Sequence, residues 1–411
     1  MNILVVNWAL YPTGGDWTYV ENVIRLYENM GHHVVPFSMK DDRNKETPYS
    51  KYFIENIDYK KVNRRSFAAG VKVVMKSIYS TEAQQNLELL LSNVKIDFAH
   101  INVIHHYITP TILKILKKRN IPIIWTLHEY TPICPDSIFV SNGQICERCY
   151  GGRFYNCVTH ACKKGSYLAS AVAALENYVH EYLNYYELVD YYVCASVFQF
   201  EKYKQFNFFN DKLIQLYHGY NYGEVDGVLQ AKKTATERYI VFVGRLEKIK
   251  GIFTLMAAMQ LVSKDIKLKI VGDGTREAEL KALKAEYGLN NVEFLGKKTQ
   301  HETLEIINNA EFLICPSECY EVLGFTVVEG MALGKPVIGA RIGAIPEMVV
   351  DDYTGMLFTP GNAEQLAQKI EQLYNNDQIV ELMGKNAYEH IRKLINNEHH
   401  YEGLKKLIRG L

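Results

Sequence analysis

One stretch in the second half of the chain decides the fold: Cys315-Pro-Ser-Glu-Cys-Tyr-Glu321-Val-Leu-Gly-Phe-Thr-Val-Val-Glu329-Gly-Met-Ala-Leu-Gly-Lys-Pro336-Val-Ile-Gly. Residues 312–315 are apolar and run into Pro-Ser, which predicts a buried strand that ends in a loop. Residues 325–333 are apolar around one carboxylate and lie between two glycines, which predicts a packed helix. A helix that begins at the carboxyl end of a parallel strand presents free N–H groups and a positive dipole to ligands. The stretch therefore predicts an α/β fold with a phosphate site before this helix.

Two carboxylates in this stretch suggest separate roles. Glu321 falls in the loop and Glu329 about a turn and a half into the helix, so they need not be neighbours. The pattern Glu-x7-Glu, with Gly-Phe between the two and Gly-Lys-Pro-Val-Ile after them, resembles the signature of the retaining nucleotide-sugar glycosyltransferases called group 1 or family 4. The competing interpretation is a core helix with one capping and one surface glutamate.

Length and charge limit the function classes. The 411 residues are too many for one ordinary core and predict two domains. Lys plus Arg and Asp plus Glu are both 46, so no net field selects nucleic acid, and any phosphate recognition must be local. No apolar run reaches the ~18 residues of a membrane span. We expect residues 2–10 to be a first strand and not a signal peptide, hence a cytoplasmic protein. The basic stretch 64–76 leaves peripheral contact with the inner membrane face open, although a solvated face is the commoner explanation.

The amino-terminal segment predicts a parallel sheet. Residues 2–8 have the pattern of a buried strand, residues 11–16 of a tight loop, residues 19–30 of a helix, and residues 31–37 of the next strand. The turn is not Gly-x-Gly-x-x-Gly, which disfavours a nicotinamide or flavin cofactor. Gly15 and its neighbour Gly14 instead allow a ligand to approach the backbone, although a plain turn explains either one equally well.

A histidine ends another predicted strand. Residues 121–127 deliver His128 to the carboxyl edge of the sheet, where an imidazole can bind a sugar hydroxyl or a phosphate and move a proton. The alternative is a hydrogen-bonded core histidine. His105 and His106 follow a different strand and are weaker candidates for the acceptor side. Residues 166–184 alternate with helical period and predict a further amphipathic helix.

Five of the eight cysteines fall between residues 134 and 162. The spacing Cys146-x2-Cys149-x7-Cys157-x4-Cys162 contains two close pairs, as tetrahedral zinc sites do, and we predict a structural zinc on these four thiolates. A reducing compartment argues against disulfides. Free thiols, or a redox pair that uses Cys134, remain as alternatives.

The second half repeats the strand, glycine turn and helix scheme after a polar linker at residues 223–237. Residues 239–243 predict a buried strand, followed by Gly244-Arg245-Leu-Glu-Lys-Ile-Lys250-Gly251. Arginine and lysine at a strand's carboxyl end can neutralise a diphosphate, one by its bidentate fork and the other as a compact charge. Solvated surface cations are the competing explanation. A strand at 268–271 ends in a second glycine turn that contains Gly272 and Gly274.

The resemblance to the group 1 glycosyltransferases spans nearly the whole chain and is most specific from Gly244 to Gly361. It implies the GT-B architecture, an α/β fold of two Rossmann-like domains that face a cleft. The expected bounds are 1–218 for the acceptor domain with a cysteine-rich insertion at 134–165, 219–385 for the donor domain, and 386–411 for a helix that returns to the first domain. Gly330 departs from the usual alanine after the second glutamate.

The same resemblance assigns roles to single residues. It implies that Arg245 and Lys250 stabilise the leaving diphosphate, Glu321 the sugar and Glu329 the ribose, while His128 contacts the sugar. The other residues expected at the donor are Gly15, Gly244, Gly272, Gly274, Gly324 and Phe325. The implied partners are a nucleotide-diphosphate sugar and a glycan or lipid-linked acceptor, with no metal in the chemistry. A sugar-nucleotide 2-epimerase of the same architecture and a non-catalytic binding scaffold are the rival functions.

Overall fold

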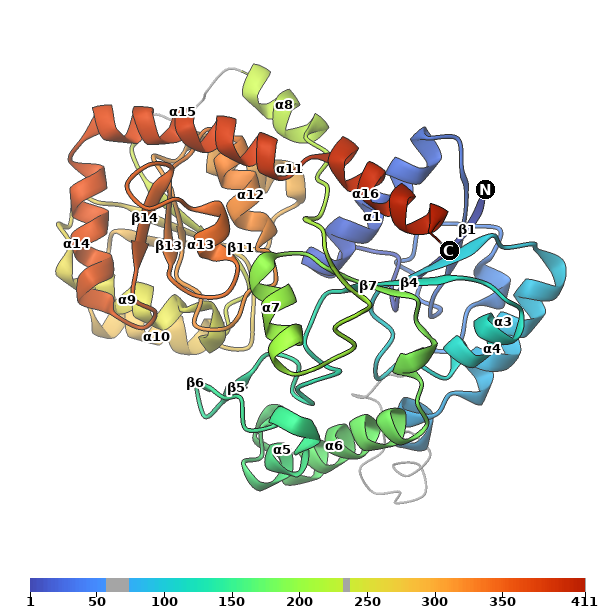
Figure 1. Cartoon of the computed structure of the whole chain (residues 1–411). Coiled ribbons are helices and arrows are strands. Elements are labelled where there is room, and N and C mark those ends of the chain that lie inside the picture. The colour runs from blue at the N-terminus through green and yellow to red at the C-terminus, as the bar shows by residue number, and fades with distance from the viewer. Residues whose placement is uncertain (57–73, 232–236, 411) are drawn as a thin grey trace. The chain divides into compact units, whose positions relative to one another are not determined.

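The computed structural model describes residues 1–56, 74–231 and 237–410, and its chain forms two compact units (Figure 1). Unit 1 contains residues 1–142, 146–219 and 397–411, and unit 2 contains residues 143–145 and 220–396. The predicted basic stretch 64–76 lies outside the described residues as far as position 73. In the described parts of the chain, no helix combines the length and the apolar character that a membrane crossing requires.

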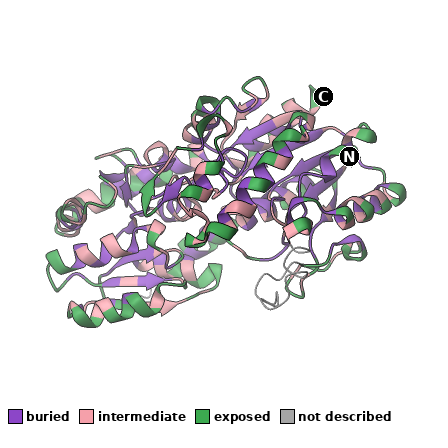
Figure 2. Ribbon diagram, turned by 90° about the horizontal axis from the view of Figure 1, so that it is seen from below, coloured by how far each residue is buried: buried purple, intermediate pink, exposed green. Residues whose placement is uncertain are grey.

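Unit 1 is built on a six-stranded parallel sheet of order β2-β1-β3-β4-β7-β8. The strands are β1 (Asn2–Val6), β2 (His33–Phe37), β3 (Phe98–Ile101), β4 (Ile123–Leu127), β7 (Tyr191–Cys194) and β8 (Leu213–Gln215). Its longer helices are α1 (Gly15–Asn29), α3 (Thr81–Asn93), α4 (Ile112–Lys118), α6 (Tyr167–Tyr182), α7 (Val197–Gln205) and α16 (Asn397–Arg409). Shorter elements are η1 (Ser50–Tyr52), β5 (Val140–Ser141), η2 (Tyr150–Gly152), α5 (Tyr155–Thr159), η3 (Lys163–Gly165) and η4 (Tyr186–Leu188). The strands read as apolar runs because helices bury both sheet faces, as the purple strands of Figure 2 illustrate.

Unit 2 contains a second parallel sheet, of order β11-β10-β9-β12-β13-β14. Its strands are β9 (Ile240–Val243), β10 (Leu268–Val271), β11 (Val292–Gly296), β12 (Leu313–Cys315), β13 (Val337–Ala340) and β14 (Gly355–Phe358). The other elements are β6 (Gln144–Ile145), η5 (Lys248–Lys250), α8 (Gly223–Gln230), α9 (Ile252–Leu261), α10 (Glu277–Glu286), α11 (Gln300–Asn309), α12 (Phe325–Ala332), α13 (Ile345–Met348), α14 (Ala363–Tyr374) and α15 (Asp377–Leu394). The predicted α/β class with two doubly wound parallel sheets is confirmed.

Strand order locates the ligand-binding edge of each sheet. In unit 1 the order reverses between β1 and β3, and in unit 2 it reverses between β9 and β12. Open α/β sheets bind ligands beyond the carboxyl ends of the strands at such switch points. The loops that begin at residues 7, 102, 244 and 316 are therefore where the fold predicts binding residues.

Two local predictions differ from the structure. The polar stretch 223–237 was expected to be a linker, yet α8 forms there, since Val225 and Val228 lie on one helical face and are buried. The last helix was expected to run unbroken from about residue 386, but α15 ends at Leu394 and α16 begins at Asn397. Ile395 takes an extended conformation between them, and the Asn22 amide donates to Asn397 Oδ1 over 2.8 Å, fixing the start of the new helix within unit 1.

Candidate functional site

The switch point of unit 2 brings together two side chains that the sequence separates. Lys250 lies in the loop after β9 and Glu321 in the loop after β12, and Lys250 Nζ donates to Glu321 Oε1 over 2.6 Å. The Ser317 hydroxyl donates to the same oxygen, also over 2.6 Å. Burial by itself would lower the pKa of Lys250 and raise that of Glu321. Their attraction outweighs burial, so the pKa of Lys250 is raised and that of Glu321 is lowered. The pair is thus ionised at neutral pH.

Arg245 lies in the same loop with its side chain exposed, and no carboxylate of the described chain forms an ion pair with it. The loop is held by a backbone hydrogen bond to the loop after β10, since Leu246 N–H donates to Asp273 O over 2.9 Å. A free guanidinium on a fixed loop can take an anionic ligand without first breaking an ion pair.

The predicted glycines bring these loops into close contact. A Cβ at Gly272, where φ is +133°, would lie 2.0 Å from Gly244 O, and a Cβ at Gly274 would lie 2.5 Å from Leu246 O. Both positions must therefore lack a side chain for the loops after β9 and β10 to approach each other. This backbone contact explains why both positions are glycine. That a nucleotide approaches the two glycines remains a prediction.

Helix α12 begins at Phe325, and the residue before it, Gly324, has a φ of +94°, which favours glycine. Gly324 has no side chain with which to satisfy the first N–H groups of the helix, so the positive end of the dipole points out of the loop that carries Glu321. The predicted strand, loop and helix arrangement is confirmed, with β12 ending at Cys315.

Glu329 has partners that the sequence did not reveal. The Tyr220 hydroxyl donates to Glu329 Oε1 over 3.1 Å, and Gln300 Nε2 lies 3.5 Å from the same oxygen. Burial raises the pKa of Glu329 to about 7. Tyr220 and Gln300 are 109 and 29 positions away from it in the chain, so no local spacing could have found them.

Gly330 has a packing role beyond helix propensity. A Cβ at this position would lie 2.9 Å from Leu313 Cδ2, closer than ordinary van der Waals contact. The departure from alanine therefore matches the close packing of α12 on β12.

In unit 1, His128 follows β4 and is firmly held. Its Nε2 lies 3.0 Å from Asn102 Oδ1, so Nε2 carries the proton and donates. Its ring lies 5.0 Å from the Tyr19 ring and 5.3 Å from the His218 ring. Burial lowers the pKa of His128 to about 4, and its imidazole is neutral at pH 7.

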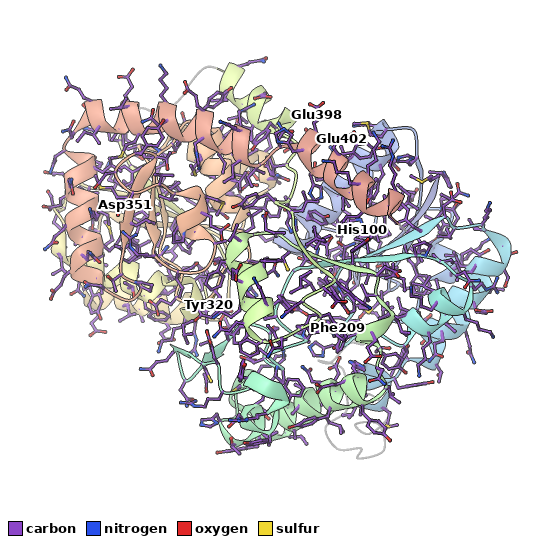
Figure 3. All side chains as sticks on the ribbon, viewed as in Figure 1. His100, Phe209, Tyr320, Asp351, Glu398 and Glu402 are labelled. Carbon is purple, nitrogen blue, oxygen red and sulfur yellow. The ribbon has the colours of Figure 1, made fainter. Side chains whose placement is uncertain are left out.

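A buried polar network supports this histidine. The Tyr19 hydroxyl lies 3.0 Å from His400 Nε2 and 3.2 Å from Thr126 Oγ1, which itself lies 2.7 Å from His100 Nε2. His100 is fully buried and is labelled in Figure 3. His400 comes from α16 near the end of the chain, so only the tertiary structure could place it beside Tyr19.

Gly15 is the first residue of α1, after Gly14 with φ +148° and ψ −154°. This conformation is open to glycine alone. In the first turn, Asp16 accepts hydrogen bonds from Trp8 Nε1 over 2.9 Å and from the Thr13 hydroxyl over 3.1 Å. The loop after β1 is thus rigid, and contact between Gly15 and a donor remains a prediction.

The weaker candidates His105 and His106 have structural partners. His105 is buried with Nε2 3.0 Å from the Tyr186 hydroxyl. His106 Nδ1 contacts Glu176, which also accepts the His106 backbone N–H over 3.0 Å and so supports a positive φ of 66°. These contacts favour a structural role for both.

The cysteine-rich region brings three of the four predicted zinc ligands into one cluster. Cys149 and Cys157 are buried in one apolar cluster with Phe154, and Cys162 packs against it. All eight cysteines are free. Burial raises the pKa of Cys157 to about 12. Among the residues that the structure describes, no three His, Cys, Asp or Glu side chains are placed to hold a metal ion, so zinc stays a prediction.

Comparison with known proteins identifies relatives by sequence. Residues 229–390 match the family model of glycosyl transferases group 1. The chain is 26% identical over 388 residues to an uncharacterized glycosyltransferase of Methanocaldococcus jannaschii, covering 93% of this chain and 91% of the relative. It is 32% identical over 159 residues to the D-rhamnosyltransferase WbpZ of Pseudomonas aeruginosa, covering 38% of this chain and 41% of that protein.

Solved structures share the fold over the full length. Sucrose-phosphate synthase of Thermosynechococcus elongatus superposes with a TM-score of 0.73 at 22% identity and covers 100% of this chain and 98% of that one. Anabaena HepE, solved in complex with UDP and glucose, gives a TM-score of 0.67 at 17% identity and covers 100% of both chains. At these identities the likeness establishes the fold alone.

Proposed function

We propose that this chain, a glycosyltransferase of the group 1 family, moves a sugar from a nucleotide-diphosphate sugar to an acceptor hydroxyl and retains the anomeric configuration. The observation that carries the proposal is the group formed by Arg245, Lys250 and Glu321 at the switch point of unit 2, one loop away from the start of α12. A family relationship, two cations and a helix dipole support the same ligand, a diphosphate.

The mechanism follows from where charge develops. When the bond between the sugar and the diphosphate breaks, negative charge grows on the leaving phosphate. Arg245, Lys250 and the backbone N–H groups at Gly324 and Phe325 would stabilise that charge, in the way that preorganised donors stabilise transition states. The two side-chain cations would serve this purpose without a divalent metal ion. The acceptor hydroxyl would attack from the face of the leaving group and pass its proton to a phosphate oxygen, which gives retention.

The carboxylates would hold the two ends of the donor. Glu321 is oriented by Lys250 and Ser317 and would accept hydrogen bonds from sugar hydroxyls. Glu329, oriented by Tyr220, would accept from the ribose. The neutral His128 would bind a sugar hydroxyl or lie on the path of the acceptor proton, because a neutral imidazole can accept at one nitrogen while it donates at the other.

The biological setting is proposed from relatives. Structures of similar fold include the lipopolysaccharide outer core galactosyltransferase WaaB and WaaG, a glycosyltransferase involved in lipopolysaccharide biosynthesis. We place this chain in the assembly of a surface polysaccharide or glycolipid, on the cytoplasmic side of the membrane.

The direct test is a screen of nucleotide sugars by thermal stabilisation, because a ligand that binds the native state raises the melting temperature. Donors that stabilise the protein are then incubated with and without candidate acceptors, and the products are analysed by mass spectrometry and by NMR of the anomeric proton. Transfer with retention supports the proposal. Isomerised donor without acceptor would reveal an epimerase, and stabilisation without any turnover would reveal a binding scaffold.

A further inference from the structure

Helix α6 of unit 1 is amphipathic, but its polar face is buried and its apolar face is exposed. Its polar residues Ser170, Glu176, Asn177 and His180 face the interior and are at most 1% exposed. Its large apolar residues face outward, and Leu168 is 76% and Tyr182 85% exposed. The sequence predicted this helix, and the usual rule would have turned its apolar face inward.

Fixed hydrogen bonds hold the polar face inside. Glu176 binds the backbone and ring of His106, Asn177 Nδ2 donates to Thr131 O over 2.6 Å, and His180 Nε2 donates to Ile78 O over 2.8 Å. Turning the helix over would leave buried groups without partners, at a cost of about 1–3 kcal/mol for each. The outward orientation of the apolar face is therefore specified by the structure.

The outward residues form one continuous surface. At 3.6 residues per turn, the exposed apolar residues of α6 fall within an arc of about 100°. The surface extends to α5, which packs beside α6 (Figure 1), because the Tyr155 backbone N–H donates to the Tyr178 hydroxyl over 3.1 Å. We call this surface the α6 apolar face, and its residues are Tyr155, Tyr167, Leu168, Leu175, Tyr178 and Tyr182. An exposed apolar surface of this kind marks an interaction site.

Its composition and flanking charge indicate the partner. Four of its six residues are tyrosines, which combine an apolar ring with a polar tip and are favoured at the boundary between lipid and water. Lys163 and Lys164 lie in η3, directly before α6, and extend the surface with positive charge. The one buried acid of α6, Glu176, points inward, and Glu181 lies against Gly152, outside the arc.

We propose that the α6 apolar face docks the protein on a membrane surface that contains anionic lipid. Leucine and tyrosine side chains would enter the headgroup region while the lysines contact lipid phosphates. The proposal goes beyond the transfer reaction and does not depend on which sugar is moved. A lipid-linked acceptor would then be encountered in two dimensions, at the surface where it resides.

Vesicle co-sedimentation tests the proposal. The full chain is mixed with vesicles of phosphatidylcholine that contain phosphatidylglycerol, and with vesicles of phosphatidylcholine alone. We expect the triple variant Leu168→Ser, Leu175→Ser, Tyr182→Ser to lower the partition constant on anionic vesicles at least tenfold. The variant Lys163→Gln, Lys164→Gln should lower it about fivefold per lysine at low salt and have no effect on neutral vesicles. The matched control, Leu261→Ser with Leu382→Ser, removes equally exposed leucines of unit 2 and should bind like the unaltered protein.

Two results would overturn the proposal. The first is equal partitioning of the unaltered protein and the triple variant, including no partitioning by either. The second is a lipid-free dimer, measured by analytical ultracentrifugation, that the triple variant loses, which would assign this face to a second copy of the chain. Circular dichroism and thermal stabilisation by the donor verify folding. The single variant Tyr182→Ser gives an independent result if the triple variant is unstable.

Discussion

Lys250 Nζ donates a hydrogen bond of 2.6 Å to Glu321 Oε1, although the two residues are 71 positions apart. The contact joins the loops after β9 and β12, the two neighbouring strands at which the order of the sheet reverses. A cation that a diphosphate could use is thus already positioned by the carboxylate that would bind the sugar.

Removing either cation tests this arrangement. We expect Lys250→Ala and Arg245→Ala each to lower turnover by about 10²-fold or more, the scale at which lost transition-state donors act. Steady-state kinetics with the donor found by the thermal screen gives the measurement. Lys248→Ala is the matched control, because this exposed lysine lies in the same loop and should leave the rate near normal. Near-normal rates in both Lys250→Ala and Arg245→Ala would refute the assignment.

Donor affinity should depend on pH through Glu329. Burial raises the pKa of this carboxyl to about 7, so it is largely protonated at pH 6 and largely ionised at pH 8. An ionised carboxylate accepts ribose hydroxyls better, and the dissociation constant of a nucleoside diphosphate should fall about tenfold from pH 6 to pH 8, in proportion to the competent fraction. Isothermal titration calorimetry measures this change. Glu329→Gln corrects for protonation of the nucleotide itself, and identical pH profiles for the two proteins would contradict the prediction.

Acid should destabilise unit 1 through its buried histidines. Burial lowers the pKa of His100 to about 3 and those of His128 and His400 to about 4. Histidine in the unfolded chain has a pKa of about 6.5, so below that pH the unfolded state binds more protons than the folded state. The contribution of these histidines to the free energy of unfolding is therefore present above pH 6.5 and is lost as the pH falls toward 4. At about 1.4 kcal/mol per pKa unit, the upper bound is on the order of 5 kcal/mol for His100 and on the order of 3 kcal/mol each for His128 and His400.

Urea unfolding at pH 7.5, 6 and 5 checks this dependence. His400→Gln should weaken it, because one buried imidazole no longer titrates. His301→Gln serves as the control, since the side chain of His301 is 63% exposed. A pH dependence that is the same in all three proteins would show that the network does not control acid stability.

Two glycines with similar backbone angles should respond differently to alanine. Gly251 has φ +68° and Gly288 φ +61°, so both substitutions carry a left-handed cost of about 1–2 kcal/mol. A Cβ at Gly251 would also lie 1.7 Å from Pro316 O, whereas a Cβ at Gly288 meets no atom within 4 Å. We expect Gly251→Ala to displace the loop of Lys250 and abolish activity, while Gly288→Ala only lowers the melting temperature by a few degrees. Comparable activity in the two variants would argue against the importance of this loop contact.

Metal analysis tests whether the cysteine cluster binds structural zinc. If Cys146, Cys149, Cys157 and Cys162 bind structural zinc, protein purified under reducing, chelator-free conditions will contain one zinc per chain by mass spectrometry. Cys157→Ser should lose the metal and Cys194→Ser, buried in β7, should keep it. Absence of zinc in the unaltered protein would leave a cluster of free thiols.

The sequence by itself determined the parallel sheets, the glycine turns and the motif that contains Arg245, Lys250, Glu321 and Glu329. It could do so because these features are local: apolar runs, positive φ angles and strand ends depend on neighbouring residues. Tertiary structure alone decided what each side chain contacts. Tyr220 reaches Glu329 across 109 positions and His400 reaches Tyr19 across 381, distances at which no spacing rule applies.

Helix α6 illustrates the same limit. The helical period of its apolar residues could be recognised in the sequence. Which face is buried, however, depends on whether distant loops supply hydrogen-bond partners for its polar side chains. Because His106, Thr131 and Ile78 do, the polar face is buried and the apolar face is left outside. The observed arrangement gives Glu176, Asn177 and His180 at least one hydrogen bond each, and a buried polar side chain that makes none is more costly than an exposed leucine.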